Sequence, residues 1–403
     1  MIERHKSVGF LIICCAFLVG FLAYFKYLNF FINTIKKMFE RETISLNIII
    51  PIGISFYIFS AISYLIDVYR GEENAEKNIL HFSLFLSFFP KIVAGPIIRA
   101  KDFLPQIKNY RGIEIKRFEC GIQMFALGLF KKIVLADHLS VFVDDVFFAP
   151  CAYNTGTVIL AVISYSLQIY FDFSGYSDMA IGIAKILGFD FKQNFNLPYI
   201  SANLSEFWKR WHISLSSWLQ DYIYIPLGGN RKGKYRTYIN IIIVMIISGL
   251  WHGAGWTFIV WGGIHGIMSC FNKAYGNNLL KLGKIPNIIM TYILVSLTWI
   301  VFRSNTLTNA YIFIRQLLTM HTGMSQPYTW SFIAMFYSAI EVIYCVVVSK
   351  RARINKDDVL QVNYSYPIMD LSKTWCLIVF FTFCGIIIIL GYYGNTAFIY
   401  GAF

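Results

Sequence analysis

The longest uncharged segment of the chain, residues 237–272, sets the strongest limit on its fold, because it contains no Asp, Glu, Lys or Arg. A helix needs about 20 apolar residues to cross a bilayer, so this segment is too long for one simple span. Three glycines, Gly249, Gly253 and Gly255, cluster near its middle. We therefore expect membrane helices on either side of a break at these glycines.

A histidine, His252, lies inside this segment between Trp251 and Gly253, and His265 follows. The helical rise places His252 about 24 Å from Arg236, much of the thickness of a bilayer's hydrocarbon core. An ionisable group at that depth is expected to be functional, because placing it in lipid is costly. The alternative is a structural histidine hydrogen-bonded between helices, and the motif alone does not decide between the two.

The composition places the whole chain in the membrane class. Of its 403 residues, 57% are hydrophobic and 14% are charged, whereas soluble proteins carry roughly 25% charged residues. Several apolar runs approach the length of a span. We expect one all-α polytopic membrane domain over residues 1–403, with about ten or more membrane segments and a retained first helix near residues 8–23.

The formal net charge of +13 lies in short loops, including the strongly basic residues 99–117. This distribution fits cytoplasmic loops that face anionic lipid. A net positive charge can also indicate nucleic-acid binding. That function would need a water-exposed domain with clustered basic residues, which the sequence lacks. The eight cysteines form no CxxC pair and no HExxH motif is present, so neither a disulfide framework nor a metal site is expected.

Three further segments carry polar groups or helix breakers in apolar surroundings. Residues 79–98 contain Pro90, Gly95 and Pro96, which predicts a broken span that lines an interior. Asp172 and Asp178 follow an apolar run. We expect these carboxylates to cap the next helix or to pair with an Arg, and acid–base chemistry is the less favoured alternative.

A run of tryptophans follows a predicted helix start at Asn203, three residues before Glu206. The spacing predicts an amphipathic helix at the membrane interface or re-entering it. Its apolar positions are Trp208, Trp211, Leu215 and Trp218. His212 lies within this pattern.

His252 and His212 are the two candidates for chemistry. A neutral imidazole can take a proton from a hydroxyl group as that hydroxyl attacks an acyl group. The same residues would equally serve as a proton relay in a transporter. The residues by themselves therefore indicate a membrane enzyme or a transporter.

Seven signatures in chain order resemble those of the membrane-bound O-acyltransferase family, in particular its bacterial branch of alginate and other polysaccharide O-acetylation proteins. They occupy residues 55–71, 89–99, 171–180, 194–199, 206–216, 221–231 and 249–256. Any one of them is a weak signal, but the ordered set is specific.

The resemblance implies a ring of tilted transmembrane and re-entrant helices around a catalytic tunnel. It implies that His252 is the catalytic histidine and His212 the second functional histidine. The expected donor is acetyl-CoA, with no tightly bound cofactor. Acetyl is expected to cross the cytoplasmic (inner) membrane to an extracytoplasmic partner that acetylates a polysaccharide such as alginate. Four basic residues are weak candidates for meeting the donor's phosphates, although positive-inside topology explains them equally well: Arg231, Lys232, Lys234 and Arg236.

Two alternatives remain at this point. The same family contains D-alanyl transferases of teichoic-acid modification, which use a carrier-protein thioester. A non-catalytic membrane transporter or scaffold is the alternative from a different class. Compared with the family, the chain is also expected to be shortened at its start. Residues 398–403 also differ from the aromatic, glutamine-containing C-terminal segment expected in relatives, which is expected to contact the external partner.

Overall fold

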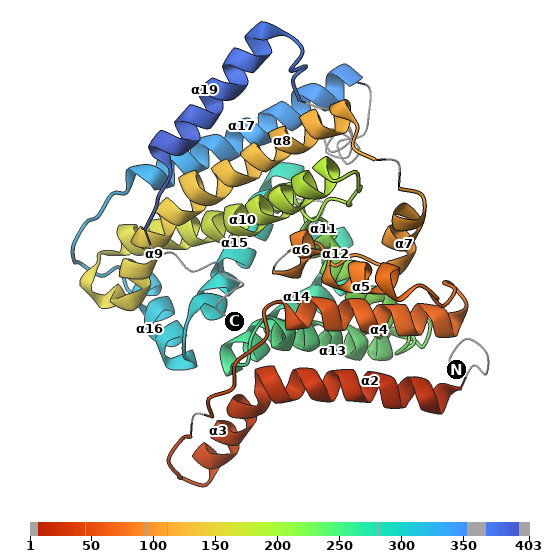
Figure 1. The fold of residues 1–403 in the computed structure, drawn as a ribbon. Coiled ribbons are helices and arrows are strands. Elements are labelled where there is room, and N and C mark those ends of the chain that lie inside the picture. Colours follow the sequence, from red (N-terminus) through yellow and green to blue (C-terminus); the bar gives the residue numbers. More distant parts are fainter. Residues whose placement is uncertain are drawn as a thin grey trace.

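The structure is a computed structural model that describes residues 7–44, 46–93, 95–110, 112–279, 283–352 and 368–394. The expectation for residues 398–403 lies outside the described residues. Helices dominate the described chain, as expected for an all-α membrane protein (Figure 1). Strand pairing among the described residues is limited to one isolated bridge between Tyr153 and Met324.

The helices fall into four groups along the chain. The first group is α2 (Val8–Leu22), the π-helical segment η1 (Ala23–Tyr27), α3 (Leu28–Met38) and α4 (Ile54–Arg70). Short elements follow as α5 (Ile79–Ser87), α6 (Phe89–Ile92) and α7 (Ala100–Lys108). The third group is α8 (Ile115–Leu129), the π-helical η2 (Phe130–Ala136), α9 (Asp137–Phe148), η3 (Pro150–Ala152) and α10 (Thr155–Ile186).

The last group begins with the short elements η4 (Pro198–Ile200), α11 (Leu204–Arg210), α12 (Ile213–Leu219) and the π-helical η5 (Gln220–Tyr224). It continues through α13 (Lys234–His252), α14 (Trp256–Leu279), α15 (Lys284–Arg303), α16 (Leu307–Leu318), α17 (Thr329–Ala352) and α19 (Thr374–Leu390). Figure 1 shows α8, α10, α17 and α19 on one side of the molecule and α2, α4, α13 and α14 on the other, with α11 and α12 between them.

Four segments of the described chain are long and apolar enough to cross a membrane, namely Val8–Met38, Thr155–Ile186, Lys284–Arg303 and Thr329–Val347. This is fewer than the ten or more spans expected, because several apolar runs fold as short or broken helices. Residues 79–98 are one example, since α5 and α6 replace a single span there. The predicted interruption of that span is confirmed.

The central helix α10 corrects one sequence expectation. Asp172 and Asp178 were expected to cap a helix that starts after them or to pair with an Arg, but both lie inside the continuous α10. They pair instead with lysines of η2. Asp172 lies 2.6 Å from Lys132, and Asp178 lies 3.1 Å from Lys131. These ion pairs compensate the carboxylates within the helix, so no break is needed there.

Reciprocal glycine pairs allow α8 and α10 to pack closely. A methyl group added at Gly182 would lie 2.6 Å from the carbonyl oxygen of Gly121, and one added at Gly121 would lie 2.6 Å from that of Gly182. Gly128 and Gly175 form the same arrangement seven residues along each helix. Small residues of this kind let helix backbones approach inside a membrane.

We expect Gly182→Ala to lower thermal stability, because the added methyl would force the two backbones apart. Overpacking of this kind costs about 1–3 kcal/mol. Gly385→Ala on α19 is the matched control, since nothing lies within 4 Å of its added methyl. Thermal unfolding in one detergent compares the two variants, and equal melting temperatures would contradict the close α8–α10 packing.

Candidate active site

His252 is the last residue of α13, and the helix stops there because Gly253 adopts an extended backbone (φ −164°, ψ 155°). The ring of Phe258 occupies the space that a side chain at residue 253 would need. The predicted break is therefore confirmed, although it falls at Gly253 and not at Gly249, which stays helical. His252 is only 2% exposed.

His212 lies at the junction of α11 and α12, where the sequence predicted one continuous helix. The predicted start is confirmed, since the side chain of Asn203 accepts a hydrogen bond from the Glu206 N–H at 2.9 Å. The continuation is wrong, because His212 has left-handed backbone angles (φ 43°, ψ 56°) that end one helix and begin the next. Non-glycine residues rarely adopt this conformation, and it concentrates at functional sites.

Asn194 holds this strained turn. Its side-chain oxygen accepts hydrogen bonds from the Ser214 N–H at 3.1 Å and the Ser214 hydroxyl at 2.8 Å, and its backbone oxygen accepts from the Ile213 N–H at 2.9 Å. The same side-chain oxygen lies 3.2 Å from Nδ1 of His212. Because an amide oxygen only accepts, Nδ1 of His212 carries the proton and Nε2 is the acceptor atom of the ring.

The two candidate histidines lie in one buried aromatic site. Their ring centroids are 6.4 Å apart, and the ring of Trp251 lies 5.7 Å from His212 and 5.1 Å from His252. Trp261 and Phe302 lie 5.3 and 5.4 Å from His252.

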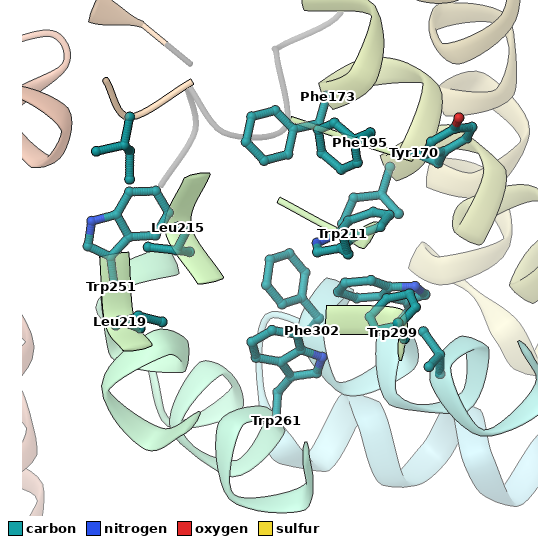
Figure 2. Close-up of a cluster of buried hydrophobic side chains, with 14 of the residues drawn as sticks. Tyr170, Phe173, Phe195, Trp211, Leu215, Leu219, Trp251, Trp261, Trp299 and Phe302 are labelled. Carbon is teal, nitrogen blue, oxygen red and sulfur yellow. The ribbon is translucent and has the colours of Figure 1, made fainter. Parts of the chain in front are cut away.

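The aromatic and aliphatic side chains around this site come from distant parts of the chain (Figure 2). α10, the loop after it, α11 to α12, and α13 to α15 each contribute to this buried cluster. The labelled members are Tyr170, Phe173, Phe195, Trp211, Leu215, Leu219, Trp251, Trp261, Trp299 and Phe302. The predicted tryptophan stripe packs against this core, with Trp211, Leu215 and Trp218 buried and Trp208 partly buried.

His265, the other histidine of the apolar segment, has a different role. Its Nε2 lies 2.9 Å from the Thr298 hydroxyl, which links α14 to α15. Its ring packs 4.8 Å from Trp261. This is the structural role that was the alternative for His252.

Two residues that sequence reasoning missed contact the end of α13. Lys26 and Tyr27 belong to η1, which lies beyond the first helix expected near residues 8–23. The Lys26 ammonium donates to the carbonyl oxygen of Trp251 at 2.6 Å, and the Tyr27 hydroxyl donates to that of Leu250 at 2.8 Å. Their distance in sequence from His252 explains why no local pattern revealed them.

A cavity of about 650 Å³ adjoins the His212 turn. It reaches Ser214, whose hydroxyl lies 3.5 Å from Nδ1 of His212. Four cations and three carboxylates line it: Arg99, Lys101, Lys185, Lys192, Asp102, Asp190 and Asp221. Ion pairs join three of these cations to these carboxylates.

The four cations proposed from the sequence lie elsewhere. All four are exposed, and none is among the residues that line the cavity: Arg231, Lys232, Lys234 and Arg236. The cavity cations come instead from α7, its preceding loop, the end of α10 and the loop after it. Because these segments are far apart in the sequence, only the fold brings their charges together.

Comparison with known proteins gives one family and several relatives. The sequence model of the membrane-bound O-acyltransferase family matches residues 72–282. A probable alginate O-acetylase AlgI of Azotobacter vinelandii is 42% identical over 319 residues, which cover 77% of this chain and 62% of that protein. A peptidoglycan O-acetyltransferase of Helicobacter pylori is 38% identical over 322 residues, covering 72% of this chain and 61% of that protein.

A teichoic acid D-alanyltransferase of Streptococcus thermophilus is more distant. It is 32% identical over 237 residues, which cover 56% of this chain and 57% of that protein. The chain thus matches only about three fifths of the length of the curated relatives described here.

We expect Asn194→Ala to destabilise the protein by about 1–3 kcal/mol, because the Ser214 N–H and hydroxyl would lose their shared acceptor in a buried turn. Asn109→Ala is the control, since Asn109 is exposed and bonds within its own helix end. Thermal unfolding of both variants measures the effect. A melting temperature for Asn194→Ala equal to that of the control would show that Asn194 does not support the His212 turn.

Proposed function

Because the chain belongs to the membrane-bound O-acyltransferase family, we propose that it transfers an acetyl group from cytoplasmic acetyl-CoA to an acceptor on the other side of the cytoplasmic membrane. The final product is an O-acetylated extracytoplasmic polysaccharide such as alginate, formed with an extracytoplasmic partner protein. The names of the relatives from Azotobacter vinelandii and Helicobacter pylori support this choice. The main observation in support of the proposal is that His252 and His212 lie close together in one buried aromatic site.

In this proposal His252 acts as the general base. It takes the proton from the acceptor hydroxyl as the hydroxyl oxygen bonds to the thioester carbonyl carbon. The carbon–sulfur bond then breaks, and the same proton passes to the departing thiolate. The products are an ester and the free thiol of coenzyme A, so atoms and charges balance.

His212 supplies the second imidazole of the site. Its Nδ1 proton is held by Asn194, so the ring has one defined tautomer and one defined orientation. We propose that Nε2 of His212 accepts a hydrogen bond from a second donor group of the acceptor and so aligns the attacking hydroxyl toward His252. Holding reacting groups in this way contributes to rate without further chemistry.

The cation-lined cavity is the proposed entrance for the donor. Its volume suits a small-molecule ligand, and its lining carries four cations against three carboxylates, an excess of positive charge that favours a phosphate-bearing donor. Ser214 lies both at the cavity wall and beside His212, which connects the entrance to the proposed site of chemistry.

Two other functions are weighed against this one. D-alanyl transfer from a carrier-protein thioester is less favoured, because the relative that carries that name is 32% identical, whereas the probable alginate O-acetylase is 42% identical. A scaffold would need no histidine pair, whereas a transporter could use the two histidines as a proton relay. Acetylation measured in the variants below separates both from the proposal.

We expect His252→Ala to lower polysaccharide acetylation by at least about 100-fold, because the general base is lost. Mass spectrometry of cell-surface polysaccharide from a complemented deletion strain measures the acetyl content. His321→Ala is the control, since His321 is exposed on the loop after α16. Unchanged acetylation in His252→Ala would refute the proposed chemistry.

We expect the double variant Lys101→Ala/Lys192→Ala to raise the KM for acetyl-CoA several-fold, because two cavity cations are removed. The matched control is Lys232→Ala/Lys234→Ala, which removes two exposed cations outside the cavity. Steady-state kinetics on protein in lipid nanodiscs compare the two. A KM increase in the control but not in the cavity variant would assign the donor to the cluster around Arg231.

A further inference from the structure

We propose that Lys26 is a positioning residue that fixes the last turn of α13 and so holds His252 in place. The kinetic consequence of this proposal rests on the proposed function of His252. Its structural part stands on contacts between η1 and α13 alone.

The last carbonyl groups of α13 find their hydrogen-bond donors outside the helix. A helix leaves its last four carbonyl oxygens without partners inside the helix, and inside a membrane an unsatisfied backbone group is strongly unfavourable. The oxygen of Gly249 accepts from the Gly253 N–H at 3.4 Å, and that of Leu250 accepts from Tyr27 at 2.8 Å. The oxygens of Trp251 and His252 both accept from the Lys26 ammonium, at 2.6 and 3.5 Å.

The charge of Lys26 also suits the end of α13. The C-terminal end of a helix carries partial negative charge, which a cation stabilises. No carboxylate among the described residues forms an ion pair with Lys26, and its remaining hydrogen bond, at 3.4 Å, is to the hydroxyl of Ser55. The end of α13 is therefore the counter-charge of this ammonium, which also lies 5.8 Å from the centre of the Trp251 ring.

The first helix changes its winding where it meets the end of α13. Lys26 and Tyr27 lie in a π-helical segment, and such segments are frequent at functional sites. Neighbouring residues hold the segment in place, since α2 packs against α4 and Phe56 of α4 contacts the Trp251 ring at 5.4 Å. The Lys26 ammonium and the Tyr27 hydroxyl therefore reach α13 from a segment, η1, that its neighbours hold in place.

The consequence concerns His252 directly. It is the last helical residue, and no further turn follows to hold it. Without Lys26 two adjacent carbonyl groups lose their donor, and the final turn is expected to open. A displacement of about 1 Å in a reacting group can lower a rate about 100-fold.

The test compares Lys26→Met, which removes the charge and the donor, with Lys26→Arg, which keeps both. Lys37→Met is the control, because Lys37 is exposed on the adjoining helix α3. Hydrogen–deuterium exchange of the purified protein in nanodiscs follows the amides of residues 249–253. Steady-state kinetics with acetyl-CoA give kcat and KM separately.

In Lys26→Met we expect faster exchange confined to residues 249–253 and a kcat at least about tenfold lower, with the donor KM within about twofold. Lys26→Arg should recover more than half of the lost exchange protection, and Lys37→Met should match the natural chain. Unchanged exchange at residues 249–253 would overturn the proposal, as would a rise spread evenly over the molecule. If the natural chain shows no acetyl transfer, the proposed function fails, and local exchange still decides the role of Lys26.

Discussion

The site depends on one constraint, that a helix ending inside an apolar protein must have its last carbonyl groups hydrogen-bonded. α13 ends at His252 in the buried interior, and no further helical turn follows to supply donors. Lys26 and Tyr27, more than two hundred residues earlier in the chain, supply them. The position of His252 is thus coupled to the packing of the first helix on the rest of the molecule.

The buried charges likewise have partners. Lys131 lies between Asp178 and Glu341, and Lys132 lies between Asp172 and Asp137. Each lysine belongs to η2, as Lys26 belongs to η1. The third π-helical segment of the described chain, η5, contains Asp221, which lines the cavity beside the His212 turn. η1 and η2 therefore direct charged groups into the interior, where neighbouring elements compensate them, and Asp221 of η5 pairs with Arg99 at the cavity.

Local patterns predicted part of this arrangement. The glycines around His252 predicted a break, and the prolines after α5 predicted a second, because both act on their immediate neighbours. The continuity of α10 through Asp172 and the bend at His212 were not predicted. The first depends on lysines of another helix and the second on Asn194. Both histidines were candidates from the residues alone, but only the family resemblance assigned their roles. Lys26 was missed because its partners are distant in sequence.

The central claim is that His252 and His212 act as one acyl-transfer site. A double-mutant cycle of kcat for acetyl-CoA-dependent transfer, with His252→Ala, His212→Ala and the double variant in nanodiscs, tests it most directly. Residues that act as a unit give strongly non-additive losses. We predict that the double variant loses little more activity than His252→Ala alone. Losses that multiply across the two positions would contradict a shared site.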